Sequence, residues 1–208
     1  MSKKGIITVI SGFSGAGKGT VVRRLVDQYG YVVSVSATTR EPREGEIDGV
    51  HYFFKTNAEF EEMIQQGELM EHAGYVGHYY GTPRGYVMQQ LDQGRDVILE
   101  IEMQGALQIK KNFPEAVLVF LTTPSYEELR NRLSGRGTET EEVIARRLQR
   151  ASEECAYLSE YDYIVVNEEV DACVEQVHQL IRSVHLKSGY QRELIDRITA
   201  EFSVSAGS

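Results

Sequence analysis

Gly12-Phe13-Ser14-Gly15-Ala16-Gly17-Lys18-Gly19-Thr20 is the stretch that decides the fold of this chain. The apolar run at residues 6–10 precedes it and is typical of a buried strand, whereas residues 21–29 carry apolar side chains at helical spacing. Glycines in a turn between strand and helix let backbone N–H groups converge on an anion. The helix N-terminus adds a partial positive charge, and Lys18 adds a full one. The stretch therefore predicts a phosphate-binding loop for a nucleoside triphosphate.

The residue after the lysine is unusual for such a loop. Gly19 stands where a Ser or Thr hydroxyl would meet Mg²⁺, and Thr20 follows it, so the hydroxyl is either shifted by one position or missing. The alternative for the whole stretch is a glycine-rich turn that binds nothing. Lys18 and the correct pattern on both flanks favour phosphate binding.

Composition sets the class of the protein. The chain has 208 residues, of which 41% are hydrophobic and 25% charged, as expected for one globular domain with insertions or for two small ones. A net charge of −9 argues against a nucleic-acid coat protein, and no apolar run approaches a membrane span. Cys155 and Cys173 show neither metal nor redox spacing. We expect a cytoplasmic protein without nucleic-acid or membrane partners; monomer and homodimer both stay open.

Five apolar segments predict buried strands, at residues 6–10, 31–35, 96–102, 117–121 and 163–167. Helical patterns separate them, including one expected to start with Thr82 as N-cap and Pro83 as its first helical residue. Alternating strands and helices predict a three-layer α/β core with a five-stranded parallel sheet. The order of the strands cannot be read from the sequence.

Two segments depart from this alternation. From Gly45 to Tyr80 the composition shifts toward Tyr, His and Glu, which predicts a small strand-rich insertion at residues 36–81. Residues 126–157 predict a glycine-broken helical pair that is either a phosphate-covering lid or an exposed pair with Glu–Arg contacts such as Glu142–Arg146. We expect a single domain with its core at residues 1–35, 82–125 and 158–188. The insertion, the lid (126–157) and a tail (189–208) complete it.

Two groups of polar residues are candidates for chemistry. Arg40 and Arg43 lie in a polar stretch, residues 36–43, read as a loop that either grips a phosphate with guanidinium forks or is merely solvated. Glu100 and Glu102 end a predicted strand, where they indicate either a Mg²⁺ or ligand site or an exposed strand end.

In combination, residues 14–18, 36–43, 77–82, 135–137 and 164–167 make the chain resemble the guanylate kinase family from residue 6 to about residue 187. The resemblance implies a P-loop kinase fold and transfer of the γ-phosphoryl group of ATP to GMP, and also to dGMP, with Mg²⁺ accompanying ATP. It implies catalytic roles for Lys18, Arg40, Arg132, Arg136 and Arg147.

The resemblance also implies binding positions. For ATP these are Gly12, Phe13, Ser14, Gly15, Ala16, Gly17, Lys18, Gly19, Thr20 and Asn167. For GMP they are Ser36, Arg40, Arg43, Tyr52, Glu71, Tyr80, Thr82 and Glu102. For Mg²⁺ they are Thr20 and Glu100.

The chemistry of guanine agrees with these positions. Guanine presents N–H donors at N1 and N2, which a carboxylate such as Glu71 beside a hydroxyl such as Thr82 can satisfy. Adenine has no N–H at N1, so the carboxylate would lose a partner. A phosphate with a second pKa of about 6 is largely a dianion near pH 7, so the acceptor needs no general base.

Four residues differ from the usual family pattern, namely Phe13 for Pro, Gly19 for Ser, and Glu100 and Glu102 for Asp. We expect activity to survive these changes. Two other functions stay open at this point: a P-loop kinase for another acceptor, such as AMP or a ribose bisphosphate, and a non-catalytic scaffold domain that binds phosphopeptides. Glu71 with Thr82 disfavours the first, and Lys18 with the lid arginines disfavours the second.

Overall fold

A five-stranded parallel sheet forms the centre of the computed structural model, which describes residues 4–75, 77–135 and 140–205. The strand order is β2-β7-β1-β8-β9. The strands are β1 (Ile7–Gly12), β2 (Val32–Val33), β7 (Val97–Glu100), β8 (Val117–Thr122) and β9 (Tyr163–Val166). Each overlaps a segment predicted as a strand, so the expected α/β core is confirmed.

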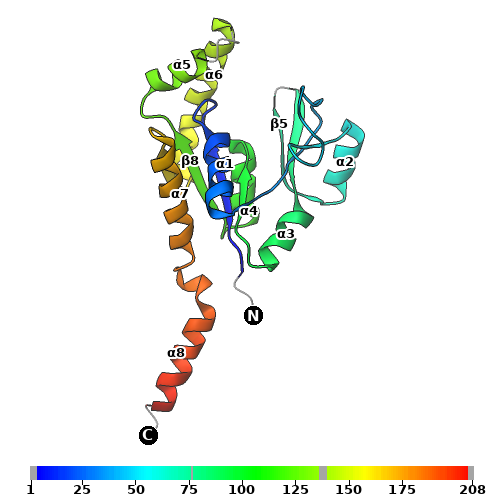
Figure 1. The fold of residues 1–208 in the computed structure, drawn as a ribbon. Coiled ribbons are helices and arrows are strands. Elements are labelled where there is room, and N and C mark those ends of the chain that lie inside the picture. The colour runs from blue at the N-terminus through cyan, green and yellow to red at the C-terminus, as the bar shows by residue number, and fades with distance from the viewer. Residues whose placement is uncertain (1–3, 76, 136–139, 206–208) are drawn as a thin grey trace.

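Helices cover both faces of this sheet (Figure 1). α1 (Lys18–Tyr29) and α7 (Val170–Val184) contact each other, whereas α4 (Met103–Asn112) contacts β1 and β8. The crossovers from β1 to β2 and from β7 to β8 run in opposite directions along the sheet. Because such crossovers are right-handed, α1 and α4 lie on opposite faces. Double coverage explains why all residues of β1 are buried.

A second, four-stranded sheet stands beside the core in the order β4-β3-β6-β5 (Figure 1). Its strands are β3 (Ala37–Thr38), β4 (Phe53–Phe54), β5 (Leu69–Tyr75) and β6 (His78–Pro83). α2 (Asn57–Gln65) starts at a capping box of Thr56 and Glu59, and its Phe60 packs with Ala37 and Leu69. The strand-rich insertion is therefore present in the fold.

Two local predictions in this region are wrong. Ala37 and Thr38 were expected in a loop, but they form β3 because β4 and β6 pair with them on either side. Thr82 was expected to cap a helix, but it lies in β6, and α3 (Arg84–Asp92) starts after Pro83 as N-cap. The Thr82 hydroxyl instead donates a hydrogen bond of 2.7 Å to Glu71 Oε1, which accounts for its place in the strand.

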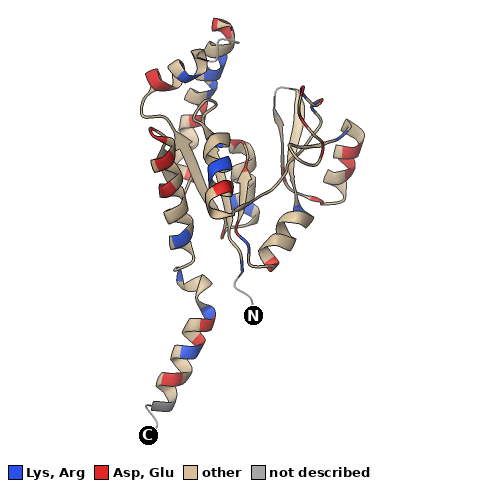
Figure 2. Ribbon diagram, in the orientation of Figure 1, with Lys and Arg blue, Asp and Glu red and all other residues tan. Residues whose placement is uncertain are grey.

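The helical pair predicted at residues 126–157 is present as α5 (Tyr126–Ser134) and α6 (Glu141–Glu154), followed by a 3₁₀ turn, η1 (Cys155–Glu160). Both helices begin at hydroxyl N-caps, Ser125 and Thr140. They stand at one end of the molecule (Figure 1), and in each helix acidic residues in the first turn are followed by basic residues (Figure 2). Some charges thus pair within the helices, as Arg132 Nε does with Glu128 Oε1 at 2.6 Å.

The chain ends in η2 (Ser188–Tyr190) and α8 (Arg192–Ser205), which extends away from the body (Figure 1). The apolar side chains of Leu194, Ile198 and Phe202 on α8 are exposed. Within the described ranges, no helix has the length and apolar character needed to cross a membrane.

Candidate active site

The glycine-rich loop joins β1 to α1 and is held in place by a hydrogen bond from the Asn167 side chain. Asn167 is buried, and its Nδ2 donates a hydrogen bond of 2.8 Å to the Ala16 carbonyl. Gly17 has a φ of 90°, and a Cβ there would lie 2.5 Å from Asn167 Nδ2. Only glycine fits both constraints without strain. Asn167, expected to contact ATP, is thus seen here anchoring the loop.

Lys18 begins α1, and its Nζ donates a hydrogen bond of 2.6 Å to the Gly12 carbonyl. Phe13 is buried and packs edge-on against Phe120, with ring centroids 4.8 Å apart. The Phe13 side chain therefore belongs to the core, which leaves its backbone to face a ligand.

Gly19 has room for a side chain. A Cβ there would lie 3.5 Å from Glu100 Oε1, an ordinary contact distance. The longer Glu100 side chain thus reaches over the first turn of α1, next to the position where the loop lacks its hydroxyl. Thr20 is exposed on the same turn.

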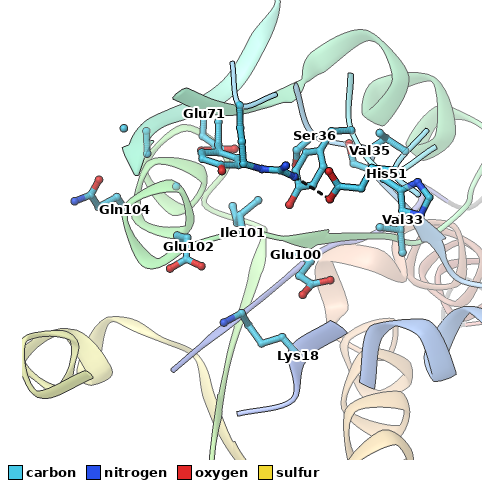
Figure 3. A pocket seen from close by; sticks show the side chains of 18 of the residues that line it. Lys18, Val33, Val35, Ser36, His51, Glu71, Glu100, Ile101, Glu102 and Gln104 are labelled. Atoms are coloured by element: carbon cyan, nitrogen blue, oxygen red, sulfur yellow. Dashed lines mark hydrogen bonds and ion pairs between the residues drawn. The ribbon is translucent and has the colours of Figure 1, made fainter. Parts of the chain in front are cut away.

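A cavity of about 370 Å³ lies between the loop and the second sheet. In Figure 3, Lys18 lies on one side and Glu71 and Ser36 on the other, with Glu100 and Glu102 between them. The structure brings together these expected site residues as its lining: Lys18, Ser36, Arg40, Arg43, Tyr52, Glu71, Tyr80, Glu100 and Glu102.

Arg40 is the central cation on the second-sheet side of the cavity. Its guanidinium carbon lies 5.3 Å from the Tyr52 ring centroid, and the Tyr52 and Tyr80 rings meet edge-on at 6.0 Å. Its Nη2 pairs with Glu46 Oε1 at 2.9 Å. Arg43 is exposed at the rim. The side chains thus present guanidinium and phenol donors to the cavity, a set suited to a phosphate.

Glu71 is a buried carboxylate that β5 of the second sheet contributes to the same cavity. It is 5% exposed, and burial raises its pKa to about 7 although hydrogen bonds from the Thr82 side chain and backbone act to lower it. Gly105 in α4 makes room for it, since a Cβ there would lie only 2.3 Å from Glu71 Oε2. Thr82 itself is fully buried, so it acts on the cavity through Glu71.

Two carboxylates at the end of β7 form the floor of the cavity. Glu100 is accessible to solvent but has protein on most sides, and this desolvation raises its pKa while nearby Lys18 opposes the shift. Glu102 Oε2 lies 3.6 Å from Nη2 of Arg150, which α6 projects into the cavity. Arg150 is held in turn by a hydrogen bond of 3.1 Å from its Nε to the buried Glu154.

Some expected residues lie elsewhere. Arg132 and Arg147 are half-buried on α5 and α6 and do not line the cavity, and Arg136 falls outside the described residues. Conversely, sequence reasoning did not single out Glu46, Gly105 or Arg150 as site residues. Arg150 lies within the predicted helical pair at residues 126–157, and nothing in the residues around it distinguishes it from the exposed Arg146 on the same helix.

The fold and this site define a P-loop kinase of the nucleotide type, in which a glycine-rich loop faces a second sheet across one cavity. The chain matches the guanylate kinase family over residues 4–184. It is 51% identical over 201 residues to a guanylate kinase of Streptococcus thermophilus, covering 94% of this chain and 96% of that one. It is 53% identical over 188 residues to a guanylate kinase of Lactococcus lactis, covering 90% and 92%.

A solved structure agrees with these relatives. The crystal structure of guanylate kinase from Anaplasma phagocytophilum superposes with a TM-score of 0.77 at 32% sequence identity, covering 94% of this chain and 95% of that one. The chain belongs to the guanylate kinase family. It therefore transfers a phosphoryl group from ATP to GMP, as guanylate kinases do.

Proposed function

We propose that this chain phosphorylates GMP, and also dGMP, with MgATP on the glycine-rich loop and the acceptor against the second sheet. The observation that carries this arrangement is that Lys18, Arg40 and Glu71 line one cavity although they come from three different parts of the chain. A donor phosphate at Lys18 and an acceptor phosphate at Arg40 would then face each other across that cavity.

The acceptor's base would be selected by Glu71. An ionised Glu71 accepts hydrogen bonds from N1–H and N2–H of guanine, and Thr82 holds the carboxylate by donating to Oε1. Because Glu71 is buried, a base without these donors leaves the carboxylate unsatisfied. Glu102, at the N-cap of α4, would face the acceptor nucleotide from the floor of the cavity.

The acceptor's phosphate would be held by Ser36, Arg40 and Arg43 with the hydroxyls of Tyr52 and Tyr80. These groups supply cationic and hydroxyl donors in one place, which matches a phosphate dianion. Because the dianion is already nucleophilic, the residues have only to orient it in line with the donor phosphate and exclude water.

The donor's Mg²⁺ would be held by Glu100, with the Thr20 hydroxyl available in the same turn of α1 as Gly19. Among the described residues no group of three or more His, Cys, Asp or Glu side chains could hold a metal by itself. This fits Mg²⁺, which in kinases takes one or two carboxylates and completes its shell with phosphates and water. When bound, the ion neutralises charge on the ATP phosphates; the protein's own share of that work falls to Lys18 and the loop amides.

We propose further that residues 126–157 act as the lid, residues 36–81 as the GMP-binding insertion and residues 189–208 as a tail outside the site. The lid would bring Arg132, Arg136 and Arg147 onto the ATP phosphates by moving toward the loop, since Arg132 and Arg147 stand off the cavity in this structure. A cytoplasmic location, where both nucleotides are available, completes the proposal.

A coupled ADP-release assay across GMP, dGMP, AMP, CMP and UMP tests this function. We expect GMP and dGMP to be phosphorylated and the other three to be poorer by at least about 10²-fold in kcat/KM, because the buried Glu71 loses its donors. A preference for AMP would overturn the role of Glu71, and absence of MgATP-dependent transfer to GMP would overturn the activity itself.

A further inference from the structure

A carboxylate lies beside the two arginines that are expected to bind the acceptor phosphate. Glu46 lies between the two arginines, with Oε1 at 2.9 Å from Nη2 of Arg40 and Oε2 accepting a hydrogen bond of 2.7 Å from the Arg43 backbone N–H. Its side chain is only 17% exposed. The family resemblance assigns no role to this residue, and a negative charge beside a phosphate dianion is unfavourable unless it has another function.

Hydrogen bonds of Glu46 link it to both arginines of the segment from Arg40 to Glu46. The Glu46 backbone N–H donates to the Arg43 carbonyl at 3.0 Å, in return for the bond that its side chain accepts from Arg43 N–H. The Arg40 backbone N–H donates a hydrogen bond of 3.1 Å to Thr38 Oγ1. The second terminal nitrogen of its guanidinium, Nη1, donates to the Glu41 carbonyl at 2.7 Å. Glu46 is therefore the side chain that ties the Arg40 guanidinium to the turn carrying Arg43.

The charge state of Glu46 suits this task. The hydrogen bond from the Arg43 amide makes the largest contribution and lowers the pKa of Glu46; burial opposes it, and the Arg40 guanidinium adds to the lowering. An ionised Glu46 occupies one edge of the Arg40 fork and leaves the rest of that planar group in a fixed orientation. A guanidinium that is already oriented loses less conformational entropy when a phosphate arrives.

We propose that Glu46 is a positioning residue for the acceptor phosphate, which holds Arg40 and the Arg43 turn in the arrangement that grips it. The inference rests on the proposed acceptor site. It predicts that Glu46 matters for the phosphate of the acceptor and not for its base, because Glu71 and Gly105 lie in other elements of the structure.

Glu46→Ala separates these two effects. We expect its KM for GMP to rise about 10- to 100-fold, as for a lost hydrogen-bonded charge pair, with KM for ATP unchanged. Guanosine, which lacks the phosphate, should inhibit the variant competitively with the same Ki as the wild type. Glu46→Gln keeps the shape of the side chain and one acceptor oxygen. Its KM for GMP should lie between those of the wild type and Glu46→Ala. The matched control is Glu44→Gln, an exposed carboxamide substitution in the same segment.

A double-mutant cycle with Arg40→Met completes the test. If Glu46 acts through Arg40, the KM for GMP of the double variant should exceed that of Arg40→Met alone by less than about 3-fold. Additive losses, equal weakening of GMP and guanosine, or tighter GMP binding by Glu46→Ala would each overturn the proposal; the last would make Glu46 a competitor of the phosphate. Isothermal titration of GMP and guanosine gives the same comparison without turnover. A failed proposal for Glu46 can therefore be distinguished from a failure of the proposed kinase activity.

Discussion

Replacing Lys18 by methionine is expected to lower kcat for GMP phosphorylation by about 10²- to 10³-fold. Lys18 lies at the N-terminus of α1 and lines the cavity, where its charge would offset the charge that develops on the transferring phosphoryl group. A preorganised donor of this kind typically contributes that much to the rate. Steady-state kinetics with saturating MgATP and GMP measures the effect, and KM for GMP should change far less than kcat.

The same substitution also removes the bond from Lys18 Nζ to the Gly12 carbonyl, so loop structure needs its own readout. Thermal unfolding of the Lys18 variant should stay within a few degrees of the wild type. Lys111→Met, at an exposed lysine of α4, is the matched control and should keep full activity. Wild-type turnover by the Lys18 variant would show that the loop is not the donor site.

Replacing Glu71 by glutamine is expected to lower kcat/KM for GMP by about 10²-fold or more, with little change in KM for ATP. Glutamine directs an N–H₂ group toward guanine donors at a buried position, which leaves donors facing donors. Gly105→Ala should produce a milder form of the same defect, because its Cβ would occupy the space of Glu71 Oε2. The displaced atom ends a flexible side chain, so the fold of the Gly105 variant should persist.

The pH dependence of GMP binding gives a second view of Glu71. Its pKa of about 7 in the free protein means that acid converts it to the neutral form, which cannot accept from both guanine donors. GMP affinity should therefore level off about one pH unit above 7, because Glu71 is half protonated at its pKa, and should fall toward about 10-fold per pH unit below 7. The acceptor phosphate titrates near pH 6 as well, and Glu71→Gln retains only that contribution. Identical profiles for the wild type and Glu71→Gln would contradict the assignment.

The core was predictable because its signals are local. Apolar runs such as that leading into β1 and the glycine-rich turn before Lys18 specify a strand, a loop and a helix without reference to distant residues. The order β2-β7-β1-β8-β9 was not predictable, since it depends on which strands pair across the sheet.

The errors share one physical cause, which is that a partner distant in sequence decides the structure. Thr82 has the sequence context of a helix cap, but Glu71 takes its hydroxyl and β5 pairs with its strand. Ala37 and Thr38 are too few to show a strand pattern, and β4 and β6 create the strand by pairing with them.

The site shows the same division. Lys18 and the arginine pair were visible as local motifs, and the family resemblance supplied Glu71. Gly105 matters only because a carboxylate from β5 lies against it, and Arg150 only because α6 aims it at Glu102. Neither contact can be predicted from the residues that flank Gly105 or Arg150 in the sequence.

One molecule that joins adenosine and guanosine through an oligophosphate bridge tests the central arrangement most directly. If a donor loop at Lys18 and an acceptor pocket at Arg40 and Glu71 face each other across one cavity, this compound should occupy both. It should then inhibit competitively against ATP and competitively against GMP, with a Kd below that of either nucleotide. Competition with only one substrate would contradict the account, because the two nucleotides would then not meet in the same cavity.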